Sequence, residues 1–372
     1  TQKWTLFPYT TLFRSNKEDE LNLIRDKIDS LDKRILSLLN ERADLAVNAG
    51  KAKEESIKYK PAREAIIFSK LKELNKGPLS NDQIISIYNE IISACRSTES
   101  DLKVAYLGPE GTYSESALQN KFGSSVDAKP EPSIKSVFEE VTKGLCDFGI
   151  VPIENSSEGS VNLTLDCLMD FELTICGEIE MRIEHNLIGY NKPLPKEGIE
   201  IHAHEQALAQ CKGWLSSYCP QAKLVPVASN SQAAMNASAN EGILAIGGKG
   251  AAKKYNLDIL DSNIEDSSSN TTRFIVIGKS QSSQTGNDKT SIIVTTKNEE
   301  GALYSVLLPF NELSLNLTHI TYRPSKKDKW HYSFFLDFEG HQDKDDVQEL
   351  FNQLDNLNAE VKILGSFPKA II

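Results

Sequence analysis

The stretch LNLIRDKIDSLDKRILSLLNERADLAVNAGKAK, from Leu21 to Lys53, decides how the first third of the chain folds. Its apolar residues recur at every third or fourth position, which predicts one long helix with a heptad seam. The members of this seam are Leu21, Ile24, Ile28, Leu31, Ile35, Leu38 and Leu45. Arg42 interrupts the seam, and a lone cation on a packing face is costly unless an anion meets it there.

Small residues and a second cation follow Arg42 on the same face of this helix. Ala46, Ala49 and Lys53 lie four, seven and eleven positions further along. With a rise of about 1.5 Å per residue, the two cations lie about 16 Å apart, and their long side chains can close on a small anion. The alternative is a coiled-coil arginine whose side chain reaches solvent. The small residues between the cations favour the anion site.

The composition limits the class of protein. A chain of 372 residues is long enough for two or three domains. Its net charge of −11, without a basic block, argues against a nucleic-acid partner. Six singly scattered cysteines suit reduced thiols in the cytoplasm and give no metal-site pattern. No apolar run approaches the length of a membrane span, so no membrane partner is expected.

The remainder of the N-terminal third predicts a disordered segment and two further helices. Residues 1–15 have no clean hydrophobic period and are expected to be a disordered leader or cloning remnant. Helices are predicted from Pro61 to Leu74 and from Asn81 to about Glu99. Three such helices make a poor core for a monomer, which predicts a homodimer or a larger homo-oligomer.

Four motifs of this helical region form a recognisable set. They are Arg25, the pair Glu41-Arg42, the run Gly50-Lys51-Ala52-Lys53 and the run Pro61-Ala62-Arg63-Glu64. Together they resemble the all-helical chorismate mutases, which rearrange chorismate to prephenate. This Claisen rearrangement needs no nucleophile and no proton transfer. The enzyme must instead hold an awkward conformer and stabilise negative charge on the ether oxygen, and cations at both ends of a small pocket do this.

The resemblance assigns roles to five residues. It implies that Arg25 of one chain and Arg42 of the other bind the two carboxylates of chorismate. It implies that Lys53 donates to the ether oxygen and that Glu64 holds the ring hydroxyl. Glu99 falls where the family has a residue facing the same ether oxygen, and it must be protonated to donate there.

Residues 101–283 alternate strands and helices, which predicts an α/β unit with mostly parallel strands. Strands at 104–107 and 148–153 are each followed by a polar loop and a helix. Such a loop at a helix N-terminus binds anions, although the alternative for the first loop is a capped helix start. Two such loops predict a ligand with two acidic groups. From the α/β pattern we expect a two-lobed fold of the periplasmic-binding-protein type, with this ligand in the cleft between the lobes.

Three motifs of this unit occur in a fixed order. They are Gly108-Pro109-Glu110-Gly111-Thr112-Tyr113-Ser114, Val151-Pro152-Ile153-Glu154-Asn155-Ser156 and Thr272-Arg273-Phe274. Together they resemble prephenate dehydratase, which removes carbon dioxide and a ring hydroxyl from prephenate to give phenylpyruvate. The resemblance implies that Thr272 carries the chemistry and that Arg273 helps to fix the substrate. Hydroxide is a poor leaving group, so a donor must meet it. A threonine hydroxyl is a very weak acid, which leaves the ultimate acid unassigned.

Eight further polar side chains are candidates for substrate binding. They are Thr112, Ser114, Asn155, Ser156, His185, His204, Gln206 and Ser231. The alternative for His185 is a core or strand-edge histidine, and the alternative for His204 and Gln206 is a helix cap. The run Ala203-His204-Glu205-Gln206 also differs from the Ser-His-Pro-Gln of the family.

Residues 278–289 are rich in Ser, Gln and Gly and are predicted to link the α/β unit to a C-terminal unit, which we place at 284–372. The predicted order of elements, βαββαβ, is that of a ferredoxin-like α+β unit. It resembles the amino-acid-binding ACT domain, whose first ligand motif matches Gly301, Ala302 and Leu303. The second motif falls at Thr321, Tyr322, Arg323 and Pro324, where only Arg323 and Pro324 match. The second motif is usually Glu-Ser-Arg-Pro, so the change leaves open how the unit responds to phenylalanine, the implied effector.

The three resemblances together imply a bifunctional enzyme. Residues 16–100 make prephenate, residues 101–283 convert it to phenylpyruvate, and residues 284–372 regulate the pathway. The expected substrates are chorismate and prephenate, with no cofactor and no metal. A fusion to a dehydrogenase lacks its nicotinamide fingerprint here. The remaining alternative is a mutase fused to a non-catalytic sensor of small acids.

Overall fold

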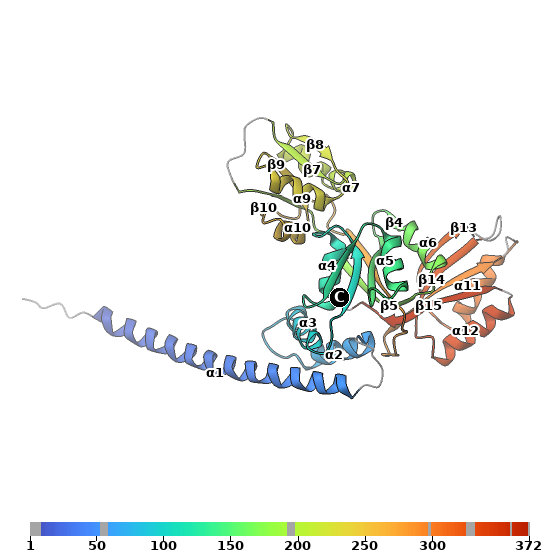
Figure 1. Cartoon of the computed structure of the whole chain (residues 1–372), viewed down its shortest axis with the longest axis horizontal. Coiled ribbons are helices and arrows are strands. Elements are labelled where there is room, and N and C mark those ends of the chain that lie inside the picture. Colours follow the sequence, from blue (N-terminus) through green and yellow to red (C-terminus); the bar gives the residue numbers. More distant parts are fainter. Residues whose placement is uncertain are drawn as a thin grey trace, which may run out of the picture.

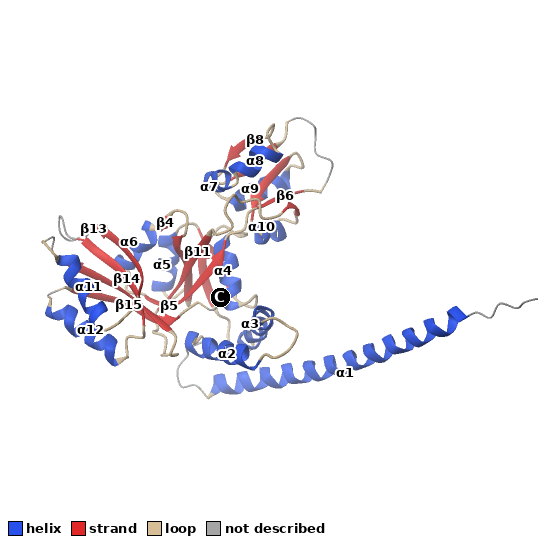
Figure 2. Ribbon diagram, turned by 180° about the vertical axis from the view of Figure 1, so that it is seen from behind, coloured by secondary structure: helices blue, strands red, loops and turns tan. Residues whose placement is uncertain are grey.

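The computed structural model describes residues 9–52, 59–191, 198–296, 299–324, 332–357 and 359–370, with side chains from residue 17 onward. Figure 1 shows an N-terminal helical unit, two α/β lobes and a C-terminal unit of sheet and helices. In both views the second lobe stands away from the other parts and joins only the first lobe (Figures 1 and 2). No helix within the described ranges is long and apolar enough to cross a membrane.

The N-terminal unit consists of α1 (Tyr9–Lys51), α2 (Pro61–Leu74) and α3 (Asn81–Ser97). The bounds predicted for α2 are confirmed, whereas α3 ends two residues before Glu99. Residues 9–15, which were expected to be disordered, form the first turns of α1. The helix extends this far because no glycine or proline occurs between Tyr9 and Gly50.

The apolar seam of α1 lies on an exposed surface of the chain. All seven predicted seam residues are exposed, by fractions between 45% and 62%. Figures 1 and 2 show why, because α1 extends away from the other elements over most of its length. Only its C-terminal end packs on α3, where Arg42, Ala46 and Gly50 are half-buried.

Lobe 1 is a mixed sheet with helices on its faces. Its elements are β1 (Lys103–Leu107), α4 (Tyr113–Phe122), β2 (Asp127–Glu131), α5 (Ile134–Thr142), β3 (Phe148–Asn155), β4 (Gly159–Ser160), α6 (Asn162–Asp170), β5 (Thr174–Arg182) and β11 (Thr271–Gly278). The strand order is β2-β1-β3-β11-β5, and β4 forms a hairpin with β3. The second predicted loop is therefore a hairpin turn, and α6 begins only after it.

Lobe 2 is a smaller mixed sheet. Its elements are β6 (Asn186–Gly189), β7 (Glu200–Ala203), α7 (Glu205–Gln210), α8 (Lys212–Tyr218), β8 (Lys223–Pro226), α9 (Asn230–Ala239), β9 (Ile243–Gly247), α10 (Lys249–Lys254) and β10 (Asp258–Asp261). The strand order is β10-β6-β9-β7-β8. The single helix predicted from His204 to Trp214 is two short helices that meet at Cys211.

The prediction of mostly parallel strands is wrong. Strand β1 runs parallel to β2 and β3, and β7 runs parallel to β8 and β9. Strand β11 is antiparallel to both β3 and β5, and β6 is antiparallel to β9 and β10. The cause is that the chain passes between the lobes twice. It leaves lobe 1 after β5, and it returns as β11, which inserts between β3 and β5. A local sequence pattern does not reveal this return.

The C-terminal unit has the predicted βαββαβ order. Its elements are β12 (Asp288–Thr296), α11 (Ala302–Glu312), β13 (Leu317–Pro324), β14 (Tyr332–Glu339), α12 (Asp345–Asn356) and β15 (Glu360–Pro368). The antiparallel sheet has the order β13-β14-β12-β15, which is ferredoxin-like. Strand β15 packs on β5 of lobe 1 at Gly365, where the backbone φ is +144° and an added Cβ would clash with the backbone oxygen of Ile175. A glycine is required at this close approach.

Candidate active sites

A cavity of about 470 Å³ lies between the two lobes. Eight of the residues predicted for the α/β unit line it: Thr112, Ser114, Asn155, His185, His204, Gln206, Ser231 and Thr272. They come from both lobes and from the two segments that connect them. The sequence motifs, which are separated by up to 160 positions, therefore meet at one site.

Thr272 lies at the start of β11, directly opposite Asn155 on β3. The amide nitrogen of Asn155 donates a hydrogen bond of 2.8 Å to the hydroxyl oxygen of Thr272. This bond uses a lone pair of the oxygen, so the hydroxyl hydrogen can be donated to a ligand in the cavity. The geometry suits a hydrogen-bond donor with a fixed direction.

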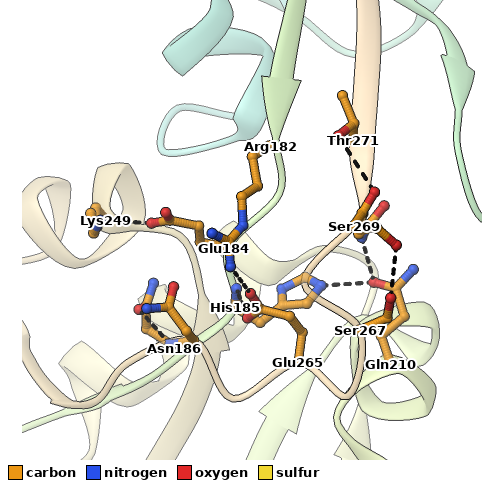
Figure 3. Close-up of polar contacts among 12 residues, drawn as sticks. Arg182, Glu184, His185, Asn186, Gln210, Lys249, Glu265, Ser267, Ser269 and Thr271 are labelled. Atoms are coloured by element: carbon orange, nitrogen blue, oxygen red, sulfur yellow. Dashed lines mark hydrogen bonds and ion pairs between the residues drawn. The ribbon is translucent and has the colours of Figure 1, made fainter.

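A line of hydrogen bonds connects Asn155 to His185. The Asn155 amide also donates to Oδ1 of Asn270 (3.0 Å), and Nδ2 of Asn270 donates to Oε1 of Gln210 (3.0 Å). The same Gln210 oxygen lies 2.8 Å from Nε2 of His185, as Figure 3 shows. Since an amide oxygen only accepts, Nε2 carries the hydrogen in this assignment. The amides between Thr272 and His185 hold orientation and do not transfer protons.

His185 is a buried residue of the first connection between the lobes, and only 2% of it is exposed. Burial lowers its pKa below the ordinary histidine value, since an imidazolium loses hydration there. Its Nδ1 lies 3.2 Å from the hydroxyl of Tyr113. The neutral ring is therefore a hydrogen-bonding support of the site. His185 is buried, as the alternative of a core histidine predicts, and it also lines the cavity.

Two helix N-termini face the cavity from opposite lobes. Thr112 is the N-cap of α4 in lobe 1, and Ser114 lies in its first turn. Ser231 lies in the first turn of α9 in lobe 2. Unpaired backbone N–H groups and the helix dipole make such termini favourable for anions. Ser231 also donates to the backbone oxygen of Glu110 and so joins the lobes directly.

The predicted helix cap at His204 is confirmed, because its Nδ1 accepts from the backbone nitrogen of Gln206 at 3.4 Å. Both residues line the cavity as well. The backbone nitrogen of His204 donates to Oδ1 of Asn230 (2.8 Å), which fixes the start of α7 against that of α9.

Two predicted substrate-binding residues do not line the cavity. Ser156 accepts from the backbone nitrogen of Thr271 (2.9 Å) and donates to the oxygen of Ser269 (3.2 Å), so it fastens the second connection. Arg273 follows Thr272 on β11, and successive side chains of a strand point to opposite faces. Its guanidinium contacts Glu178 and Asp337 on the side away from the cavity.

The two connections between the lobes are joined to each other near the cavity. Glu265 accepts from the backbone nitrogen of His185 (2.9 Å) and from Arg182 (3.0 Å). Glu184 pairs with Lys249 of α10 at 2.6 Å (Figure 3). These contacts fix the relative orientation of the lobes.

The mutase candidates are only partly brought together in one chain. Arg25 lies on the exposed part of α1, about 25 Å along the helix from Arg42. Arg42 lies at the end of α1 that packs on α3, where a Cβ at Gly50 would be 2.7 Å from Oε1 of Glu99. Lys53 lies outside the described residues.

Glu64 is buried at the junction of the helical unit with lobe 1. Its Oε1 pairs with Arg96 at 2.8 Å, and Arg96 also donates to the backbone oxygen of Phe122 (2.6 Å). Burial raises the pKa of Glu64, against the lowering effect of nearby cations that include Arg96 and Arg42. Arg42, Glu64 and Glu99 therefore belong to one region, whereas Arg25 of the same chain lies far from it.

The predicted regulatory residues lie on two elements of the C-terminal unit. Gly301 is the N-cap of α11 and has a left-handed backbone (φ +78°), and Ala302 and Leu303 are the first two residues of the helix. Thr321, Arg323 and Pro324 lie on β13, the edge strand. Arg323 makes a two-point ion pair with Asp166 of α6 (2.9 and 2.8 Å). This motif therefore contacts lobe 1.

A two-lobed α/β unit with hydroxyl, amide and imidazole side chains in the cavity between its lobes, flanked by helical and ferredoxin-like units, is the architecture of a multidomain enzyme. The family model of chorismate mutase type II matches residues 24–100, and that of prephenate dehydratase matches residues 104–282. A bifunctional chorismate mutase/prephenate dehydratase of Stutzerimonas stutzeri is 42% identical over 364 residues, which cover 96% of this chain and 100% of the relative. One from Aquifex aeolicus is also 42% identical, with 95% and 99% covered.

Solved structures agree with the sequence relatives. The prephenate dehydratase of Arthrobacter aurescens in complex with L-Phe is 30% identical, with a TM-score of 0.67 and coverage of 72% of this chain and 90% of that chain. The chain therefore belongs to the bifunctional chorismate mutase/prephenate dehydratase family. It rearranges chorismate to prephenate and then converts prephenate to phenylpyruvate.

Proposed function

We propose that Thr272 donates a hydrogen bond to the leaving ring hydroxyl of prephenate in the cavity between the lobes. The bond from Asn155 to Thr272 supports this role most strongly, because it directs the threonine hydrogen toward the ligand. The N-termini of α4 and α9 hold the two carboxylates through their backbone N–H groups, and Thr112, Ser114 and Ser231 of these termini line the site. Asn155, His185, His204 and Gln206 complete the site, and Ser156 supports it from outside.

The experiment for this proposal is the variant Thr272→Ala. Phenylpyruvate formation from added prephenate is expected to stop, while prephenate formation from chorismate continues. A folded variant that still forms phenylpyruvate at the wild-type rate would remove Thr272 from the mechanism.

We propose further that the mutase site is shared between two chains. Arg42, Lys53, Glu64 and Glu99 come from one chain, and Arg25 comes from its partner. The exposed seam of α1 supports this, because seven apolar side chains on one stripe are stabilised when a second helix covers them. Sedimentation velocity tests the assembly, and a monomer with full mutase activity would contradict it.

We propose that the C-terminal unit is an ACT domain that binds phenylalanine through residues Gly301–Leu303 and Thr321–Pro324 and feeds back on the enzyme. The ferredoxin-like topology and the solved dehydratase in complex with L-Phe support this proposal. We place the domains at 16–100, 101–283 and 284–372, and the loops between α3 and β1 and between β11 and β12 support the two internal boundaries. Calorimetric titration with phenylalanine tests the binding.

The six free cysteines suit a cytoplasmic location.

A further inference from the structure

Four charged side chains form a buried cluster between lobe 1 and the C-terminal unit. Arg273 of β11 contacts Oε2 of Glu178 through Nε (2.9 Å) and Oδ2 of Asp337 through Nη1 (2.6 Å). Lys289 of β12 also contacts Oε2 of Glu178, at 2.9 Å. All four side chains are less than a tenth exposed. The cluster is neutral as a whole, with two cations and two carboxylates.

The cluster lies directly behind the dehydratase site. Thr272 and Arg273 are neighbours on β11, and Asn155 and Glu154 are neighbours on β3. One member of each pair lines the cavity, and the other faces the C-terminal unit. Glu154 pairs with His319 of β13 (3.3 Å), and this hydrogen bond holds the pKa of Glu154 below its ordinary value.

The pairing of β11 with β3 is also irregular at this point. The register shifts between Arg273 and Phe274, as in a β-bulge. A bulge changes the direction of nearby side chains and depends on its surroundings for its exact geometry. The position of the Thr272 hydroxyl is therefore sensitive to how Arg273 is held.

We propose that Asp337 is a positioning residue of the dehydratase reaction. The C-terminal unit completes the site by pairing Asp337 with Arg273, which fixes β11 and keeps Thr272 against Asn155. Without the Asp337 carboxylate, Arg273 keeps Glu178, which it shares with Lys289, and the more distant, partly exposed carboxylate of Glu154 (3.9 Å). Buried positive charge is then poorly compensated. A shift of the strand follows, and displacement of a catalytic group by about 1 Å lowers a rate up to a hundredfold. The inference rests on the proposed role of Thr272.

The test is Asp337→Asn in the full chain, with Glu172→Gln as the matched control. Glu172 pairs with Lys362 of β15 (2.9 Å), so it also joins the same two units, but it lies on the surface away from the cluster. Asp337→Asn is expected to lower the dehydratase kcat about ten- to a hundredfold with little change in KM, and to leave mutase activity intact. Glu172→Gln is expected to leave both activities unchanged. A wild-type kcat for Asp337→Asn, or an equal loss for Glu172→Gln, would overturn the proposal.

A second measurement separates positioning from general destabilisation. If Arg273 and Asp337 act as a pair, the double variant Arg273→Gln/Asp337→Asn loses less kcat than the product of the two single losses. Independent, multiplicative losses would overturn the pairing. If Asp337→Asn fails to fold, Ser291→Ala replaces it, because the Ser291 hydroxyl donates to Oδ1 of Asp337 (2.5 Å) and its loss is expected to lower kcat more mildly.

Failure of this inference and failure of the proposed function give different results. If Thr272→Ala is inactive and Asp337→Asn retains its kcat, only the role of Asp337 is lost. If Thr272→Ala retains its activity, the threonine assignment itself is lost.

Discussion

Asn155 and Thr272 lie opposite each other on β3 and β11, and the amide of Asn155 donates to the hydroxyl of Thr272 across 2.8 Å. Because the two strands come from segments more than a hundred residues apart, the site exists only when lobe 1 is fully assembled. The same amide also bonds Asn270, so its orientation is fixed from two sides.

Replacement of the Asn155 amide by a carboxylate is expected to be more harmful than its removal. In Asn155→Asp the carboxylate accepts the Thr272 hydrogen, which is then no longer offered to the substrate. The dehydratase kcat should fall about a hundredfold or more. Asn155→Ala should lose less, and mutase activity should be unchanged in both. Rates of phenylpyruvate formation that rank the two variants in the opposite order would refute the assigned direction of the hydrogen bond.

Arg96 is expected to be important for stability. Its removal in Arg96→Gln leaves the Glu64 carboxylate buried without its partner, and the oxygen of Phe122 loses a charged donor. The free energy of unfolding should decrease by about 3–5 kcal/mol, as for other broken buried ion pairs. Lys103→Gln, which removes a half-exposed pair with Asp127 at 3.9 Å, should change it by about 0.5 kcal/mol or less. Urea unfolding of both variants measures the difference.

His185 should make stability depend on pH. Burial lowers its pKa in the folded chain below the ordinary value of 6.5, so the unfolded chain binds a proton more readily. The free energy of unfolding therefore decreases as the pH falls below about 6.5, and the loss ends once the pH is below the folded pKa. His185→Gln removes this contribution. Unfolding curves between pH 5 and 8 should show a smaller decrease for the variant, and equal decreases would show that other groups cause the effect.

The exposed seam of α1 should control both assembly and the first reaction. Leu31→Glu places a charge in the seam and is expected to lower the mass of the assembly and the mutase activity together. Dehydratase activity should remain. Lys33→Glu introduces the same acid on the helix face opposite the seam and should leave the assembly unchanged. Sedimentation velocity measures the mass of the assembly in both variants, and separate assays measure the two activities. An unaltered assembly in Leu31→Glu would show that the seam is not the interface.

Sequence patterns predicted the order of the three units, and eight of the ten site residues that they predicted in the α/β unit line the cavity. They succeeded at Thr112 and Ser114 because a polar loop before a helix has a local signature. They did not reveal Tyr113, Gln210 or Asn270, whose contribution depends on contacts between distant segments. Asn270 is the easiest of these to anticipate, since it lies two residues before Thr272.

Two further predictions were wrong for physical reasons that concern β-strands. Strand β2 was missed because its sequence, Asp127–Glu131, is polar and contains Pro130, which is tolerated at the edge of a sheet. Arg273 was assigned to the substrate although its neighbour Thr272 was assigned there too. The alternation of side chains along a strand places such neighbours on opposite faces, and this rule alone favours the position that the structure shows.

The central claim is that two separate sites, one around Arg42 and one around Thr272, carry the two reactions. The most direct measurement follows prephenate and phenylpyruvate after chorismate or prephenate is supplied to Arg42→Ala and Thr272→Ala. Arg42→Ala should fail to use chorismate and still convert prephenate, and Thr272→Ala should accumulate prephenate. Loss of both reactions in either folded variant, or retention of the assigned reaction, would contradict the claim.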